Sequence, residues 1–146
     1  EEFRDAQEAA REHDMGVVMW SYPRGQGLKD DTSASTIAYA SRLGLELGAD
    51  IAKVKYPGSA DAMEWAVDSA ANMKVVMSGG SKTSDEAFLS TVREAMDAGA
   101  NGLAVGRNVF QRENPEAILD GLEAVIFEDA TVDEALAASA GLDASD

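Results

Sequence analysis

The sequence has 146 residues, with 27 acidic and 12 basic side chains, one His and no Cys, and its formal net charge at pH 7 is −15. The length fits one domain, the charge argues against binding to nucleic acid, and the lack of Cys excludes disulfides and thiolate metal sites. No apolar run approaches the ~18 residues of a membrane-spanning helix, and the N-terminus carries no apolar leader of the kind that secreted proteins have. An acidic, lysine-poor surface is typical of the salt-rich cytoplasm of a halophile, although a merely acidic mesophilic protein has a similar composition.

Apolar, β-branched runs alternate with helical patterns along the whole chain. Asn114 followed by Pro115 predicts one helix start. Thr83 and Thr131, each with a Glu three residues later, predict two more helix starts as capping boxes. In chain order we expect helix 3–12, strand 16–22, helix 33–47, strand 49–56, helix 60–71, strand 74–78, helix 83–98, strand 102–105, a helix from 115 and a short helix from 131.

Regular alternation of strands and helices with short turns predicts an α/β fold with a parallel sheet. About four parallel βα units make half of a (β/α)8 barrel, and a whole barrel typically needs ~250 residues. A chain that starts within a helix and without Met fits the C-terminal half of such a TIM barrel, so we expect residues 1–146 to be a single partial domain whose N-terminal half is absent. A complete four-stranded doubly wound domain is the alternative, weakened because no G-x-G-x-x-G follows the first strand.

Polar residues collect where the predicted strands end, and the carboxyl ends of barrel strands are where active sites of this fold lie. The second strand carries Lys53 and Lys55, which share one face of the strand about 7 Å apart. Both faces of a parallel strand are usually buried, and burial and like charge both favour the neutral amine that a Schiff-base nucleophile requires. The alternative is that one or both lysines extend into solvent at the end of the strand.

Aromatic residues and an arginine mark the end of the first strand. Trp20 and Tyr22 point to the same side because they are two positions apart. The phenol of Tyr22 could move a proton beside an iminium carbon, whereas both rings could instead fill a barrel core. Arg24 follows directly and could hold a phosphate group. Asp30 and Asp31, further along the same loop, are interpreted as solvated residues rather than metal ligands.

Glycine-rich loops follow the last two predicted strands. Ser78-Gly79-Gly80 ends one strand, and Gly106-Arg107 ends the other. Glycine lets backbone N–H groups approach an anion, and an arginine can donate two hydrogen bonds to phosphate oxygens. The loops after strands seven and eight are a frequent phosphate site in (β/α)8 barrels, so this pair of loops predicts a phosphate site.

At these motifs the sequence resembles the archaeal-type class I fructose-bisphosphate aldolases, a Schiff-base (β/α)8 family. The matching stretches run in order from Gly16 to Leu136: WSYPRG, IAYASRLGLELGADIAKVKY, VVMSGGSKT, DAGANGLAVGRNVFQRENP and VDEAL. The resemblance implies that Lys53 forms the iminium with dihydroxyacetone phosphate, that Tyr22 donates the proton and that Trp20 lies beside it. Substrate-binding positions of the family fall on Arg24, Lys55, Ser78, Gly79, Gly80, Gly106 and Arg107.

The reaction implied by the resemblance is the reversible cleavage of fructose 1,6-bisphosphate into dihydroxyacetone phosphate and glyceraldehyde 3-phosphate. The resemblance implies no metal and no cofactor. Its implied partners are a small phosphorylated sugar and, for the full-length enzyme, further copies of the same chain. It also implies a cytoplasmic enzyme of glycolysis and gluconeogenesis. Because the family's N-terminal half supplies a catalytic Asp, we expect the isolated chain to be inactive.

Two other functions stay open at this point. The 2-amino-3,7-dideoxy-threo-hept-6-ulosonate synthases of aromatic amino-acid biosynthesis resemble the chain along the same motifs and also use a lysine. Trp20 and Lys55 favour the aldolase, because the synthases lack the tryptophan and the second lysine at these positions. The other alternative is a non-catalytic half-barrel that binds phosphate without turnover.

Overall fold

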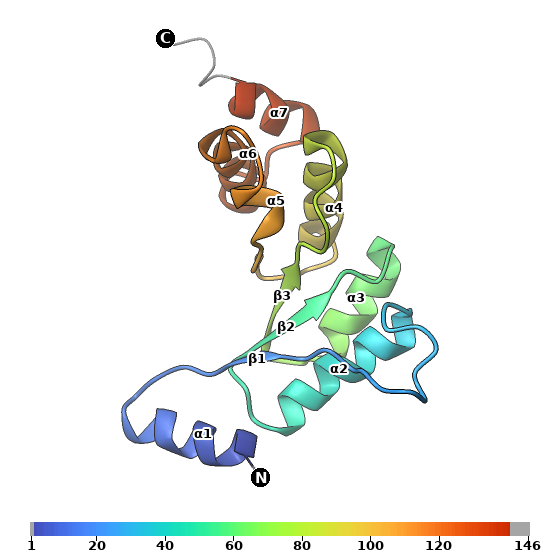
Figure 1. The fold of residues 1–146 in the computed structure, drawn as a ribbon, viewed down its shortest axis with the longest axis vertical. Helices are drawn as coiled ribbons and strands as arrows, with labels where there is room; N and C mark the ends of the chain where they lie inside the picture. Colours follow the sequence, from blue (N-terminus) through green and yellow to red (C-terminus); the bar gives the residue numbers. More distant parts are fainter. Residues whose placement is uncertain (1, 141–146) are drawn as a thin grey trace.

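The computed structural model describes residues 2–140, in which helices alternate with parallel strands (Figure 1). This order confirms the predicted α/β class. Within the described range, no helix is both long and apolar enough to cross a membrane. The elements are α1 (Glu2–Glu12), β1 (Val18–Trp20), α2 (Ala34–Glu46), β2 (Ile51–Lys55), α3 (Ala60–Ser69), β3 (Lys74–Ser78), α4 (Asp85–Asp97), α5 (Arg107–Phe110), α6 (Pro115–Phe127) and α7 (Val132–Ala140).

The sheet has parallel strands in the order β1-β2-β3, so each strand lies beside its predecessor in the sequence. The register pairs Trp20 with Lys53 and Lys55 with Ser78. Paired residues of neighbouring strands project from the same face of a sheet. The register therefore brings predicted site residues of all three strands onto one face.

The predicted strand 102–105 is wrong as a regular strand. Leu103 forms a single bridge with Met77 of β3. Two hydrogen bonds flank it, from Met77 N to Gly102 O at 3.0 Å and from Ala104 N to Met77 O at 2.9 Å. Gly102 has a φ of +141°, which is outside the strand range and interrupts the ladder at that end. The segment still runs parallel to β3 and places the loop that follows it beside the end of that strand.

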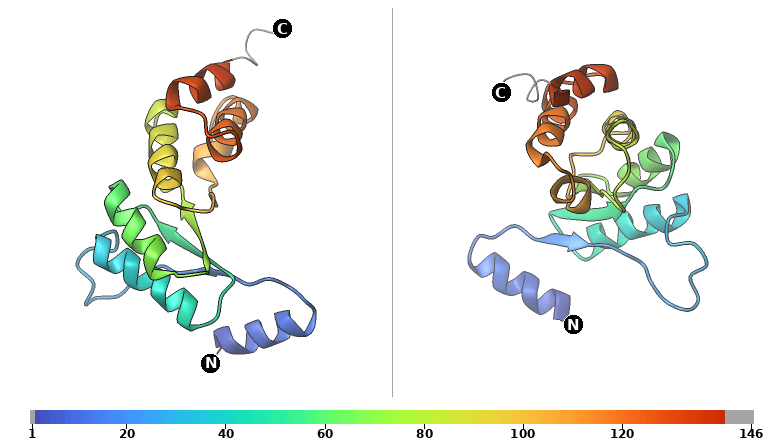
Figure 2. Two further views of the ribbon diagram at one scale, coloured as in Figure 1. Left: turned by 180° about the vertical axis from the view of Figure 1, so that it is seen from behind. Right: turned by 45° about the horizontal axis from the view of Figure 1, so that its top comes forward.

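One face of the sheet is covered by helices. In Figures 1 and 2, α2 and α3 lie side by side against the strands, and α4, α6 and α7 form a second group of helices beyond β3. Ala52, Val54, Val75 and Met77 belong to this covered face, and each is at most 1% exposed. These side chains form the centre of the hydrophobic core.

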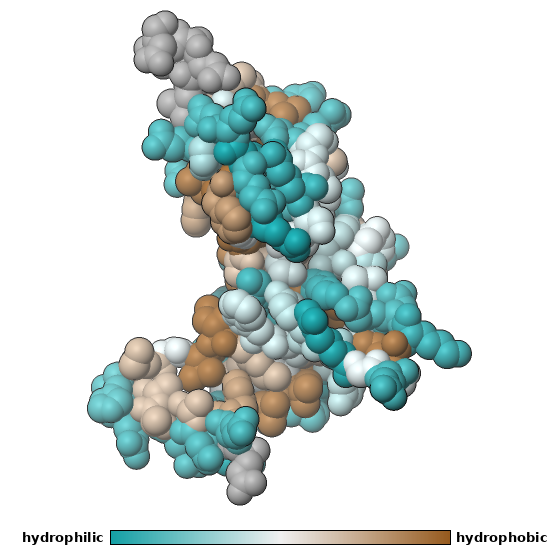
Figure 3. Space-filling model, in the orientation of Figure 1, coloured by the Kyte–Doolittle hydropathy of each residue, from teal (hydrophilic) through white to brown (hydrophobic). Residues whose placement is uncertain are grey.

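The opposite face of the sheet is open. Val18 and Trp20 on β1 are 50% and 69% exposed, and Lys53 and Lys55 on β2 are half-buried. Figure 3 shows apolar surface, in brown, beside β1 and again over α5 and α6. The lysines and the tryptophan that were predicted to carry chemistry therefore lie on the face that the helices leave uncovered.

Helix starts follow the predicted caps with one exception. The caps of α6 and α7 are confirmed, the second as a capping box in which Thr131 and Glu134 hydrogen-bond to each other's backbone. These bonds from Thr131 lower the pKa of Glu134. The predicted capping box at Thr83 is wrong, because Ser84 caps α4. The N–H of Thr83 instead donates to Oδ1 of Asn108, which holds Thr83 in the preceding loop.

Candidate active site

A cleft of about 640 Å³ opens at the carboxyl ends of the strands. Nine of the ten predicted site residues line it, and the tenth, Trp20, lies beneath the amine of a lining residue, Lys53. The nine lining residues are Tyr22, Arg24, Lys53, Lys55, Ser78, Gly79, Gly80, Gly106 and Arg107. The cleft is thus built where the sequence predicted that polar residues would gather.

Lys53 lies over the indole of Trp20, with Nζ 4.4 Å from the ring centroid. The rings of Trp20 and Tyr22 are 6.3 Å apart between centroids and inclined by 41°. The end of β1 that carries them is fixed by Ser21, whose N–H donates to Lys53 O at 3.0 Å and whose hydroxyl donates to Ala40 O at 2.7 Å. The π-electrons of an indole attract an ammonium group, so the ring helps to hold the lysine in one place.

Lys55 has a partner of its own. It forms an ion pair with Asp31 from the loop between β1 and α2, with side chains 29% and 41% exposed. Asp31 is partly exposed, as expected for a loop residue, but the sequence analysis did not predict that it pairs with Lys55. Its neighbour Asp30 shapes the loop by accepting the N–H and the hydroxyl of Thr32, and these bonds lower the pKa of Asp30.

Two loops form the other wall of the cleft. The first follows β3 and contains Gly79 and Gly80; the second contains Gly106 and Arg107 and leads into α5, a short helix that the sequence did not predict. A Cβ at Gly79 would lie 2.7 Å from Cγ1 of Val105, so only glycine lets the two segments approach this closely. Gly80 has a φ of +62°, a left-handed conformation that glycine adopts without strain.

Tyr56 is a cleft residue that the sequence analysis missed. It follows Lys55 directly, lines the cleft and donates a hydrogen bond from its hydroxyl to Glu94 on α4. Burial and the Glu94 carboxylate raise the pKa of Tyr56. A signal was present, because Tyr56 ends the KVKY stretch of the family resemblance. In the part of the chain that the structure describes, no three His, Asp or Glu side chains gather closely enough to hold a metal ion.

Comparisons with known proteins agree with this geometry. The DeoC/LacD aldolase family matches residues 1–112. A class 1 fructose-bisphosphate aldolase from Halobacterium salinarum is 74% identical over 136 residues, which are 93% of this chain and 52% of the relative. A 2-amino-3,7-dideoxy-D-threo-hept-6-ulosonate synthase from the same organism is 40% identical over 121 residues, which are 83% of this chain and 45% of that relative.

A solved structure of a Schiff-base-forming fructose-1,6-bisphosphate aldolase superposes with a TM-score of 0.83 at 40% identity. The match covers 85% of this chain and 50% of the other. The chain therefore spans about half the length of the relatives that it matches. The fold prediction is confirmed, because the alternating helices and parallel strands match half of a TIM-barrel aldolase.

Proposed function

Because this chain belongs to the DeoC/LacD family of aldolases, we propose that it carries the Schiff-base centre of a class I fructose-bisphosphate aldolase. The reaction is the reversible cleavage of fructose 1,6-bisphosphate into dihydroxyacetone phosphate and glyceraldehyde 3-phosphate. The observation that carries the proposal is the amine of Lys53, which lies over Trp20 in a cleft that Tyr22 and two glycine-rich loops also line. The 74% identity to the halobacterial aldolase supports the same substrate.

In the proposed mechanism Lys53 is the nucleophile. Its neutral amine adds to the C2 carbonyl of the sugar bisphosphate, and loss of water gives an iminium. As the C4 hydroxyl loses its proton, the C3–C4 bond breaks and its electron pair moves into the iminium, which becomes an enamine and releases glyceraldehyde 3-phosphate. Tyr22 assists this proton transfer and delivers a proton to C3. Hydrolysis of the resulting iminium releases dihydroxyacetone phosphate and regenerates the amine.

The two phosphate groups bind on opposite walls of the cleft in this proposal. The loops Ser78–Gly80 and Gly106–Arg107 take one phosphate, with backbone N–H groups and a guanidinium as donors. Arg24 and Lys55, which line the other wall, take the second. The ion pair with Asp31 supports this role for Lys55, because it orients the ammonium group at the end of β2.

Borohydride trapping of the full-length protein with dihydroxyacetone phosphate, followed by peptide mass mapping, tests the nucleophile. We expect a reduced adduct on Lys53, retained in a Lys55→Met variant and lost in Lys53→Met. The two variants remove the same charge from the same strand, so they separate covalent chemistry from electrostatics. No adduct in a folded wild-type protein would remove the aldolase and favour the non-catalytic, phosphate-binding alternative.

The hept-6-ulosonate synthase is the second candidate, because a relative with that name is 40% identical to the chain. Trp20 and Lys55 favour the aldolase. Parallel assays decide between them, one with fructose 1,6-bisphosphate and one with a deoxyketose phosphate plus aspartate semialdehyde. Turnover of the deoxyketose phosphate with aspartate semialdehyde, and not of fructose 1,6-bisphosphate, would show that the protein is the synthase and not the aldolase.

We also propose that residues 1–146 form a single partial domain of a cytoplasmic homo-oligomer. The exposed apolar surface at Val18 and Trp20 supports the partial domain, because the open face of a parallel sheet is normally covered by the rest of its fold. Size-exclusion chromatography with light scattering in molar salt, on the full-length protein, gives the number of copies. A monomeric full-length protein would contradict the oligomer.

A further inference from the structure

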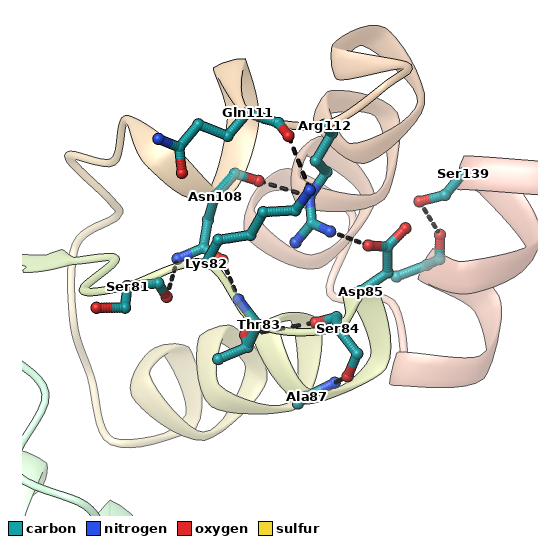
Figure 4. A network of polar contacts seen from close by, with 11 residues as sticks. Ser81, Lys82, Thr83, Ser84, Asp85, Ala87, Asn108, Gln111, Arg112 and Ser139 are labelled. Atoms are coloured by element: carbon teal, nitrogen blue, oxygen red, sulfur yellow. Dashed lines mark hydrogen bonds and ion pairs between the residues drawn. The ribbon is translucent and has the colours of Figure 1, made fainter.

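Asn108 is buried between the two glycine-rich loops, with 1% of its surface exposed (Figure 4). Its Nδ2 donates to the carbonyl oxygen of Gly79 at 2.5 Å and to that of Ser81 at 2.9 Å. Its Oδ1 accepts the N–H of Thr83 at 3.0 Å. A primary amide offers two N–H donors and one carbonyl oxygen, and all three are used here. One side chain of α5 is therefore joined at three points to the loop that follows β3.

These bonds engage the carbonyl groups of Gly79 and Ser81 with the buried amide of Asn108. The N–H groups of Gly79, Gly80 and Ser81 donate to no acceptor within residues 2–140. The same holds, over the same described range, for the N–H groups of Gly106 and Arg107 in the second loop. All five residues line the cleft, so both loops keep backbone donors available to an anion.

Arg112 is hydrogen-bonded to the backbone of Asn108 (Figure 4). Its Nε donates to the backbone oxygen of Asn108 at 2.6 Å, and its guanidinium forms an ion pair with Asp85 at the start of α4. The Arg112 side chain is only 8% exposed, and the guanidinium lies 5.8 Å from the ring centroid of Phe88. Arg112, in the turn after α5, thus joins the backbone of Asn108 to the start of α4.

We propose that Asn108 is a positioning residue that fixes the spacing between the two loops and so presets their N–H groups for a phosphate group. The identification of that phosphate as part of the sugar substrate rests on the proposed function. Gly79 and Gly80 give the first loop large backbone freedom, and an unrestrained loop must be ordered when the ligand binds. The three hydrogen bonds of Asn108 remove that freedom beforehand.

Calorimetric titration of the full-length protein with inorganic phosphate, at constant chloride concentration, measures this role directly. We expect Asn108→Ala to weaken phosphate binding about tenfold and to raise the KM for fructose 1,6-bisphosphate by a similar factor. The kcat should change by less than about threefold, and borohydride should still trap Lys53, because the substitution leaves the lysine strand untouched. Arg112→Lys keeps a charge beside Asp85 but removes the Nε donor, and should weaken phosphate binding about threefold. If Asn108→Ala does not fold, the phosphate affinity of Arg112→Lys tests the proposal, and an unchanged affinity would contradict it.

Asn101→Ala is the matched control. Its Oδ1 accepts the N–H of Val75 at 2.9 Å, so it makes a similar bond nearer the other end of β3. This variant should lower the Tm and leave phosphate affinity unchanged. Wild-type phosphate affinity in Asn108→Ala, or an equal loss in Asn101→Ala, would overturn the proposal, as would a wild-type protein that binds no phosphate. Phosphate binding without any Lys53 adduct would instead count against the aldolase and leave the role of Asn108 standing.

Discussion

The two faces of the sheet differ in the side chains that they present and in what covers them. Toward the helices, β2 presents Ala52 and Val54, both fully buried. On the other face the same strand presents Lys53 and Lys55, beside a tryptophan, Trp20, that is 69% exposed. Alternate residues of β2 thus have different roles. Ala52 and Val54 stabilise the fold by packing in the core, whereas Lys53 and Lys55 line the cleft and are available to a ligand. Substitutions along β2 should separate stability from activity one residue at a time.

Replacing Lys53 by Met should give the largest effect on activity. We expect aldol cleavage to fall by more than the ~10²–10⁴-fold that a lost proton-transfer group costs, because no covalent intermediate can form. The free energy of unfolding should change by less than about 0.5 kcal/mol, since the side chain is only half-buried and its amine lies over the exposed ring of Trp20. Steady-state assays and urea denaturation of the full-length protein measure the two quantities. A variant that loses stability and activity together would contradict the division between the faces.

Replacing Val54 by Ala should lower stability and leave activity almost unchanged. The side chain is fully buried in the core, so its truncation should lower the free energy of unfolding by about 2 kcal/mol. The kcat at a temperature where the variant is folded should stay within about twofold of the wild-type value. Val76→Ala is the matched control, because Val76 pairs with Lys53 on the open face and is only half-buried. In residues 1–146 alone Val76→Ala should lower the free energy of unfolding less than Val54→Ala does, and equal destabilisation there would contradict the division between the faces.

Removing the ion pair between Asp31 and Lys55 should have a smaller effect on activity. We expect Asp31→Asn to raise the KM for fructose 1,6-bisphosphate about threefold, because Lys55 then loses the partner that orients it. A double-mutant cycle with Lys55→Met should give a coupling free energy below about 1 kcal/mol, because both side chains are partly exposed. Since salt screens exposed charges, the coupling should decrease further in molar salt. A coupling that stays constant with salt would contradict a solvent-exposed pair.

Tyr56 should give the smallest effect, confined to alkaline pH. Burial and the hydrogen bond to Glu94 raise the pKa of Tyr56 above its ordinary value of 10.0. The folded state therefore keeps a proton that the unfolded chain loses, so this contribution to stability is fully present below pH 10 and is lost as the pH rises above 10. Between about pH 9 and pH 11, the free energy of unfolding of Tyr56→Phe should fall less than that of the wild type. Urea denaturation at both pH values measures this, and equal decreases would refute the shift.

Local pattern predicts most of the fold. The strand predicted at 74–78 has the same bounds as β3, because its apolar run and the following glycines are unambiguous. Contacts between loops could not be predicted in this way. Asp31 reaches Lys55 across 24 positions, and Asn108 reaches Gly79 across 29. Such contacts exist only once the sheet has set the spacing between strand ends, so neither helical nor strand periodicity carries a signal for them.

Residues that line the cleft were easier to predict than Asn108 and Asp31, which hold other residues in place, because the contacts of these two residues depend on the folded sheet. Residues that end strands were recognisable because parallel strands of one sheet all end at the same edge. The buried side chain of Asn108 has an ordinary polar residue type and a position in a short helix that the sequence did not predict. Its proposed positioning role depends on three hydrogen bonds to backbone atoms. Every residue has these backbone atoms, so the sequence does not indicate which residues Asn108 contacts.

The placement of Lys53 over Trp20 also gives the protein an optical reporter. The sequence contains two tryptophans, and Trp65 on α3 can be replaced by Phe to leave one indole. The fluorescence of that indole then comes from a ring whose centroid is 4.4 Å from the lysine nitrogen. Indole emission responds to nearby charge, so covalent bonding at this nitrogen should change it. Stopped-flow fluorescence of Trp65→Phe would follow each intermediate on Lys53 in real time, with no label on the sugar.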